Sequence, residues 1–128
     1  MKRYLFALLA LALSGCATAQ TVDPTIAKIA AYPINCSEKS LCDLYMQRAQ
    51  VWISRNSRFR IQIATDSVVS TYGPTDNLDM AYRVTREPNA DGSAHISVQA
   101  GCGSDYCTPS VTEARAVLKN YIITGKGP

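Results

Sequence analysis

The sequence predicts an α+β domain in which a three-stranded antiparallel meander is covered by an N-terminal and a C-terminal amphipathic helix. Three observations lead to this fold class. Segments in the middle of the chain alternate polar and apolar residues, as half-buried strands do. Longer segments on either side carry apolar residues at helical spacing. Four cysteines that follow the first 19 residues favour two disulfides.

Residues 1–19 are expected to be a signal peptide and not part of the fold. Lys2 and Arg3 precede an apolar run of ten residues, Tyr4 to Leu13. A run of this length is too short to span a bilayer as a stable helix, but it is typical of a secretion signal. The mature protein is therefore expected to leave the cytoplasm.

The end of this signal, Leu13-Ser14-Gly15-Cys16, resembles the lipobox of bacterial lipoproteins. In that family the cysteine thiol receives a diacylglycerol and becomes the first mature residue, so the resemblance implies a lipid anchor on Cys16. Ala17 in the next position implies transport to the outer membrane. Cleavage after Ala19 by the ordinary signal peptidase is the alternative, and it gives a soluble periplasmic or secreted protein.

The charge of the mature chain argues against binding to nucleic acid. Removal of Lys2 and Arg3 leaves 11 of the 13 basic residues against 10 acidic ones, so the net charge falls from +3 to about +1. A nucleic-acid binder needs a larger basic excess or a basic face.

The remaining chain of about 110 residues is expected to form one domain over residues 36–124, with a tether or short helix before it at 20–35 and a tail at 125–128.

The four mature cysteines, Cys36, Cys42, Cys102 and Cys107, form an even set in an exported chain. Such a set indicates two disulfides in an oxidising compartment, the periplasm. We favour Cys36 with Cys42 and Cys102 with Cys107, because closing a short loop costs little chain entropy. A crossed pairing stabilises the domain more and stays open. Their spacing does not match a zinc site, so no metal or cofactor is expected.

Helices are expected before the strands. Asp23-Pro24 starts a marginal segment that Pro33 stops, and a short helix and a flexible spacer both fit it. The first substantial helix is expected at about 40–57, with Ser40 and Asp43 as a capping box. Trp52, the single tryptophan, lies on its apolar face and is interpreted as a core anchor.

Three strands are expected in the centre. Residues 59–65 alternate, with Ile61 and Ile63 on the same face. Residues 66–72 either continue this strand past a bulge or are irregular, since two adjacent valines break the alternation. Residues 80–86 and 94–100 form the other two strands, and a turn at 88–92 joins them as a hairpin.

A helix is expected after the third strand. Pro109 is tolerated in a first turn, and Ser110 precedes Glu113 by the three residues of a capping box. Apolar residues then recur at helical spacing as far as Ile122. Strand, cysteine loop and helix follow one another directly, so we expect a corner that a disulfide fixes.

The search for a catalytic set is mostly negative. His95 is the single histidine, and it is placed on the polar face of the third strand beside Ser97 and Gln99. No Gly-x-Ser-x-Gly elbow, Walker loop or dinucleotide fingerprint is present. We therefore expect no enzyme, and a small hydrolase with His95 as base is kept as an alternative.

The loop between Cys102 and Cys107 is the candidate binding site, with residues Gly103, Ser104, Asp105 and Tyr106. A disulfide orders the loop before binding, and an aromatic beside an acid suits protein recognition. Of the two interpretations we prefer the simpler one, in which the disulfide only fastens strand to helix and Tyr106 packs inward. The Cys-x4-Cys spacing at the end of a strand resembles periplasmic inhibitors of vertebrate-type lysozyme. That family's loop enters the lysozyme active site but carries Lys-Pro-His-Asp, which this loop lacks.

Together these features predict a small non-catalytic lipoprotein of the cell envelope that binds a protein or another envelope component. Its expected location is the periplasm, on the outer membrane through Cys16. A lysozyme-type inhibitor acting through the Cys102–Cys107 loop is the first alternative, because of the resemblance above.

Overall fold

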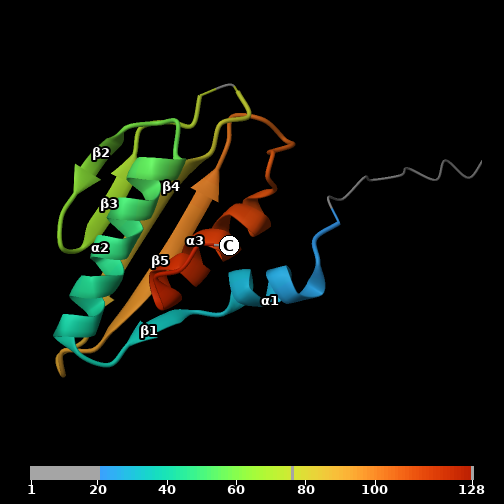
Figure 1. The fold of residues 1–128 in the computed structure, drawn as a ribbon. Helices are drawn as coiled ribbons and strands as arrows, with labels where there is room; N and C mark the ends of the chain where they lie inside the picture. The colour runs from blue at the N-terminus through green and yellow to red at the C-terminus, as the bar shows by residue number, and fades with distance from the viewer. Residues whose placement is uncertain (1–20, 76, 128) are drawn as a thin grey trace, which may run out of the picture.

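The computed structural model describes residues 21–75 and 77–127 (Figure 1). In this part of the chain, two helices cover one face of a five-stranded antiparallel sheet, and a third helix packs against one of them. The elements are α1 (Pro24–Ala31), β1 (Ile34–Cys36), α2 (Lys39–Asn56), β2 (Ile61–Ala64), β3 (Val68–Thr71), β4 (Ala81–Pro88), β5 (Ala94–Gly101) and α3 (Val111–Thr124). The strands lie in the order β1-β5-β4-β3-β2. The predicted signal peptide, with its lipobox and Cys16, lies outside the described residues.

The α+β class is confirmed, but the predicted three-stranded sheet is wrong. Two strands were not predicted from the sequence, each for a physical reason. The reason is simpler for β1. It is three residues long and pairs with β5, with Ile34 opposite Ile96. Ile34 and Cys36 are buried while Asn35 between them is exposed. A single alternation is too short for a sequence pattern to reveal.

The second missed strand, β3, contains two adjacent valines that interrupt the alternation of polar and apolar residues. Val69 is buried and faces the helices, while Val68 is on the opposite face and partly exposed. Both faces of the strand therefore carry a valine. The chain reverses before β3 because Thr65 pairs with Val68: the Thr65 amide donates to the Val68 carbonyl at 2.8 Å, and Thr65 Oγ1 accepts from the Val68 amide at 2.9 Å. β2 and β3 thus form a hairpin.

The expectation that Ile61 and Ile63 share a face is also wrong. The pairing register of β2 with β3 shifts between these two residues, so Ile61 is opposite Thr71 and Ile63 is opposite Ser70. An extra residue in one strand reverses the side-chain alternation that follows it. As a result Ile63 is 38% exposed on the uncovered side of the sheet.

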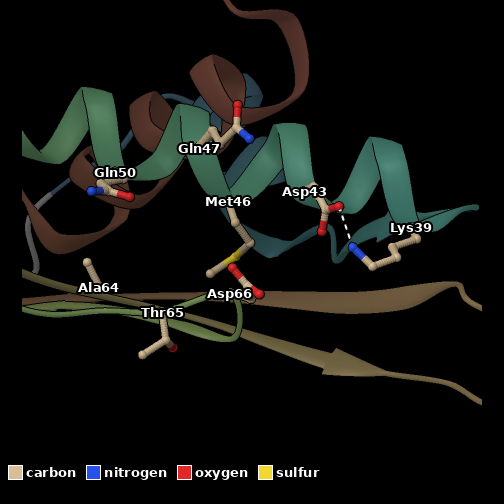
Figure 2. A pocket seen from close by; sticks show the side chains of 8 residues that line it. All are labelled: Lys39, Asp43, Met46, Gln47, Gln50, Ala64, Thr65 and Asp66. Atoms are coloured by element: carbon tan, nitrogen blue, oxygen red, sulfur yellow. Dashed lines mark hydrogen bonds and ion pairs between the residues drawn. The ribbon is translucent and has the colours of Figure 1, made fainter.

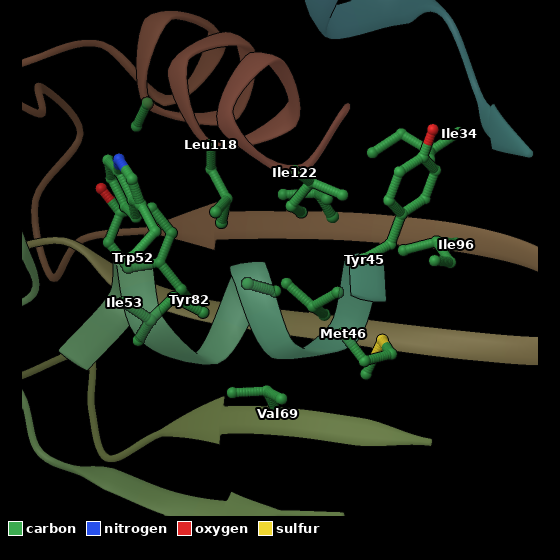
Figure 3. Close-up of a cluster of buried hydrophobic side chains, with 14 of the residues drawn as sticks. Ile34, Tyr45, Met46, Trp52, Ile53, Val69, Tyr82, Ile96, Leu118 and Ile122 are labelled. Carbon is green, nitrogen blue, oxygen red and sulfur yellow. The ribbon is translucent and has the colours of Figure 1, made fainter. Parts of the chain in front are cut away.

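The core lies between the sheet and helices α2 and α3 (Figure 3). Trp52 of α2 meets Tyr82 of β4 edge to face, with ring centroids 5.3 Å apart and planes at 83°. From α3, Leu118 and Ile122 point into the space between α2 and the sheet, and both are fully buried. Trp52 is 8% exposed, which confirms it as a core anchor.

One of the two predicted capping boxes is confirmed. At the start of α3, Ser110 Oγ accepts from the Glu113 amide at 3.2 Å, and Glu113 Oε2 accepts from the Ser110 amide at 3.0 Å. The other is wrong, because α2 begins at Lys39 with Glu38 as its N-cap. Asp43, placed one turn inside α2, binds other side chains instead.

Residues 20–35 were expected to be either a short helix or a flexible spacer, and they contain helix α1. It packs on α3, whose buried Lys119 donates from Nζ to the carbonyls of Ala30 at 2.6 Å and Tyr32 at 2.8 Å. These carbonyls lie at the C-terminal end of α1, where the helix dipole is negative and a cation is favourable. Lys119 therefore holds α1 on the domain.

Both disulfides join cysteines that are close in sequence, which confirms the pairing favoured from the sequence. Cys36 pairs with Cys42 across a Cα separation of 5.3 Å, and Cys102 pairs with Cys107 across 5.8 Å. The first joins β1 to the start of α2. The second closes the segment that follows β5. Disulfides of this kind are found in oxidising compartments.

Candidate functional site

The loop closed by Cys102 and Cys107 is exposed between its two cysteines. Residues 103–106 are all exposed, whereas Cys107 is buried. Tyr106 is 55% exposed, so the interpretation in which it packs inward is wrong. Inside the loop, the Tyr106 amide donates to Ser104 Oγ at 3.3 Å. The disulfide and this local hydrogen bond both limit the conformations of the loop.

This loop is tied to the connection between β3 and β4. The Gly103 amide donates to the carbonyl of Asn77 at 3.0 Å. Two further contacts fix the β3–β4 connection from the other side. The Tyr72 amide donates to the Arg60 carbonyl at 3.0 Å, and Arg58 pairs with Asp79 at 3.6 Å.

Three segments far apart in sequence therefore meet at one end of the sheet, at the top of Figure 1. They are the α2–β2 connection, the β3–β4 connection and the Cys102–Cys107 loop, and we call this end the loop end. It exposes three large side chains that are apolar in whole or part: Tyr72 at 53%, Leu78 at 52% and Tyr106 at 55%. We call these three residues the loop-end patch.

The sequence revealed only part of this patch. Tyr106 was found because two cysteines bracket it, but Tyr72 and Leu78 lie in a connection that was expected only as a loop. An apolar leucine in a polar loop was the one available signal for Leu78. The meeting of the loops depends on the Gly103–Asn77 hydrogen bond, which no local pattern predicts.

His95 lies on the uncovered face of the sheet, as expected, with Ser97 and Gln99 at the next two positions of that face. Its Nδ1 is 3.2 Å from Asn35 Oδ1, and it is opposite Glu87 in the β4–β5 pairing. In the described part of the chain no serine hydroxyl forms a hydrogen bond with the ring. The hypothesis of a hydrolase with His95 as base stays a prediction, which loss of activity in His95→Ala would support.

A pocket of about 350 Å³ lies between α2 and the β2–β3 hairpin (Figure 2). Its lining is Lys39, Asp43, Met46, Gln47, Gln50, Ala64, Thr65 and Asp66. Asp43 accepts from Lys39 Nζ at 2.7 Å and from Arg86 Nη1, also at 2.7 Å. The hydrogen bonds from Lys39 and then Arg86 hold the pKa of Asp43 below its usual value. Asp43 thus joins α2 to β4.

Two further findings concern membranes and metals. None of the helices within residues 21–75 and 77–127 is both long and apolar enough to cross a membrane. Over the same residues, no group of three or more His, Cys, Asp or Glu side chains is placed to hold a metal ion.

The fold and the loop end define a small disulfide-bonded α+β domain that presents a patch of exposed side chains on tied loops. In comparisons with known proteins, no family model matches this chain, and no match was found among the curated proteins or the solved structures.

Proposed function

We propose that the protein is a non-catalytic binding module of the bacterial cell envelope, and that its partner is a protein bound at the loop-end patch. The observation that carries this proposal is the joining of two loops by the Gly103–Asn77 hydrogen bond, with Tyr72, Leu78 and Tyr106 exposed on them. Exposed aromatic side chains on an ordered support are typical of the centres of protein interfaces.

Loops that are already restrained before binding favour this function, because they lower the entropy cost of forming a complex. Binding by a flexible loop loses affinity, because the loop must become ordered in the complex. Here the disulfide limits the Cys102–Cys107 loop, and the hydrogen bonds of the Tyr72 amide to the Arg60 carbonyl and of the Asp79 amide to Asn77 Oδ1 limit the neighbouring connection. These restraints reduce the loss of conformational entropy when a partner binds.

The envelope location depends on the lipobox and on the disulfides. If lipid is attached at Cys16, six residues lie between it and Asp23, the N-cap of α1, so the two Cα atoms are seven residue steps apart. Seven extended steps span at most about 25 Å, so the anchor keeps the domain near the membrane surface. Radioactive palmitate tests the anchor: incorporation is expected in the parent and none in Cys16→Ala. Incorporation that persists in Cys16→Ala would contradict the lipidation site.

Photo-crosslinking in the host bacterium tests the binding surface. Benzoylphenylalanine in place of Tyr106 is expected to give a discrete protein adduct on irradiation. The matched control is the same residue in place of Tyr32, which is 61% exposed but lies at the end of α1. The patch is supported if the adduct forms at position 106 alone and is lost in Leu78→Ser. Equal adducts at both positions, or none at 106, would contradict it.

A lysozyme-type inhibitor is the second candidate, and the exposure of residues 103–106 favours it. An exposed loop closed by a disulfide has a shape that can enter an active-site cleft. Lysis of cell walls by lysozyme is measured with and without the purified protein. The inhibitor proposal expects slower lysis with the parent and with Tyr32→Ala, but not with Tyr106→Ala. Unchanged lysis with the parent would end this candidate.

A further inference from the structure

A hollow of about 220 Å³ lies on the uncovered face of the sheet, beside the loop end. The strand register explains it. Ala81 is opposite Gly101, so this cross-strand row carries only one methyl group and forms a low floor. In the next row, Ser70, Arg83 and Gln99 lie side by side on β3, β4 and β5 and form one wall. Gly73 and Pro74 line the other side.

The polar groups of this wall have few partners in the protein. Within the described residues, the Arg83 guanidinium and the Gln99 amide form no hydrogen bond or ion pair with another side chain or the backbone. Ser70 Oγ donates only a long hydrogen bond of 3.4 Å, to the Thr71 carbonyl. Rotation of the hydroxyl can exchange this bond for one to a ligand oxygen.

The charge of the hollow is positive. Glu87 is the acidic residue of β4 on the same face, and it is four residues from Arg83 along the strand. Four residues of a strand span about 13 Å, which is beyond the reach of a direct ion pair. Arg83 therefore presents an uncompensated charge to solvent.

We propose that this hollow binds a carboxylate group, with Arg83 as its ion-pair partner. The fork of a guanidinium matches the two oxygens of a carboxylate. Gln99 Nε2 and the Ser70 hydroxyl supply further donors to the same oxygens. A single guanidinium balances the one charge of a carboxylate, whereas a phosphate carries more charge than this wall can balance. The proposal goes beyond the protein contact at the loop-end patch and uses none of its three residues.

Gly101 offers a substitution that closes the hollow without harm to the fold. A Cβ added there meets no atom within 4 Å, and its backbone does not have the positive φ that favours glycine. Gly101→Val therefore fills the floor and suits a strand. Ser97→Val is the control, because Ser97 is on the same face of β5 but outside the hollow.

The experiment is a titration followed by amide ¹H–¹⁵N NMR. The probes are acetyl-dialanine with a free terminal carboxylate, an acetyl-alanyl-glutamate amide with a side-chain carboxylate, acetyl-dialanine amide, and inorganic phosphate. The two carboxylate probes distinguish a chain terminus from a side chain as the source. The proteins are the parent, Arg83→Gln, Gly101→Val, and the controls Arg60→Gln and Ser97→Val.

At least one carboxylate probe is expected to shift the signals of residues 70, 83, 99 and 101 with a Kd in the millimolar range, on the order of 1 mM. Arg83→Gln and Gly101→Val should weaken it about tenfold or more, while both controls bind as the parent does. Equal shifts by the neutral amide, tighter binding of phosphate, or unchanged binding in Arg83→Gln would overturn the proposal. The loop-end patch is tested by crosslinking at position 106, which this titration does not use, so failure of one proposal is distinguishable from failure of the other.

Discussion

The Gly103 amide donates a hydrogen bond of 3.0 Å to the Asn77 carbonyl, and so joins the Cys102–Cys107 loop to the β3–β4 connection. A backbone hydrogen bond of this kind fixes the relative position of two loops only if each loop is itself ordered. The disulfide limits the first loop. In the second, the Asp79 amide donates to Asn77 Oδ1 at 3.1 Å and the Tyr72 amide donates to the Arg60 carbonyl at 3.0 Å. The loop-end patch therefore depends on both.

Opening the second disulfide should loosen the loop end. In Cys102→Ser/Cys107→Ser we expect the free energy of unfolding to fall by about 2 kcal/mol, because a short loop is no longer closed in the unfolded chain. We also expect faster hydrogen exchange of the Gly103 amide. Cys36→Ser/Cys42→Ser is the control, with a comparable loss of stability but unchanged exchange at Gly103. Equal exchange in the parent and the first variant would contradict the role of the disulfide.

Trp52 should be a main contributor to core stability. Trp52→Ala removes the edge-to-face contact with Tyr82 and leaves a cavity between α2 and the sheet. The expected loss is about 3–5 kcal/mol in the free energy of unfolding, measured in urea. Tyr72→Ala, at a side chain that is 53% exposed, should change it by less than about 0.5 kcal/mol. Similar losses in both variants would refute this view of the core.

Acid should weaken the link between α2 and β4. The pKa of Asp43 is lower in the folded state than the ordinary 3.8, so between those two values the unfolded chain binds more protons. The stabilisation by Asp43 is thus fully present above pH 3.8 and is lost as the pH falls through the folded-state pKa. Asp43→Asn should be less stable than the parent near neutral pH, and the difference should shrink on acidification.

Urea unfolding at several pH values measures this difference. Asp66→Asn is the matched control, because Asp66 lines the same pocket but forms no ion pair with a described residue. Its difference from the parent should not show the same dependence on pH. A gap between parent and Asp43→Asn that stays constant down to low pH would show that the carboxylate charge is not what matters.

Lys119 should be required for the attachment of α1. Burial, and then the charge of Arg115, hold the pKa of Lys119 below its ordinary value, so its two hydrogen bonds must offset a desolvation cost. Lys119→Met keeps the apolar stem but leaves the Ala30 and Tyr32 carbonyls without this donor. We expect faster hydrogen exchange over residues 24–32 with little change in β4 and β5. Lys28→Met, at an exposed position of α1, should have no such effect.

The sequence predicted the elements whose signals are local. The β4–β5 hairpin follows from alternation, the start of α3 from the Ser110–Glu113 spacing, and the disulfides from short loops. Alternation failed where a strand had three residues, as in β1, or apolar residues on both faces, as in β3. It also failed at the bulge that separates Ile61 from Ile63.

The candidate sites were less predictable, because they depend on residues that the fold brings together. Asp43 was expected to cap its own helix, yet it binds Arg86, which lies 43 residues further along the chain. Ser70, Arg83 and Gln99 form one row only because three strands align in this register. No spacing within the sequence marks either arrangement.

The central claim is that a disulfide-ordered loop end recognises a protein. The most direct measurement is the adduct yield of benzoylphenylalanine in place of Tyr106, compared between the parent and Cys102→Ser/Cys107→Ser, with position 32 as reference. We expect a discrete adduct at 106 that decreases severalfold when the disulfide is absent, and no such adduct at 32. An adduct at 106 whose yield is the same without the disulfide would contradict the claim.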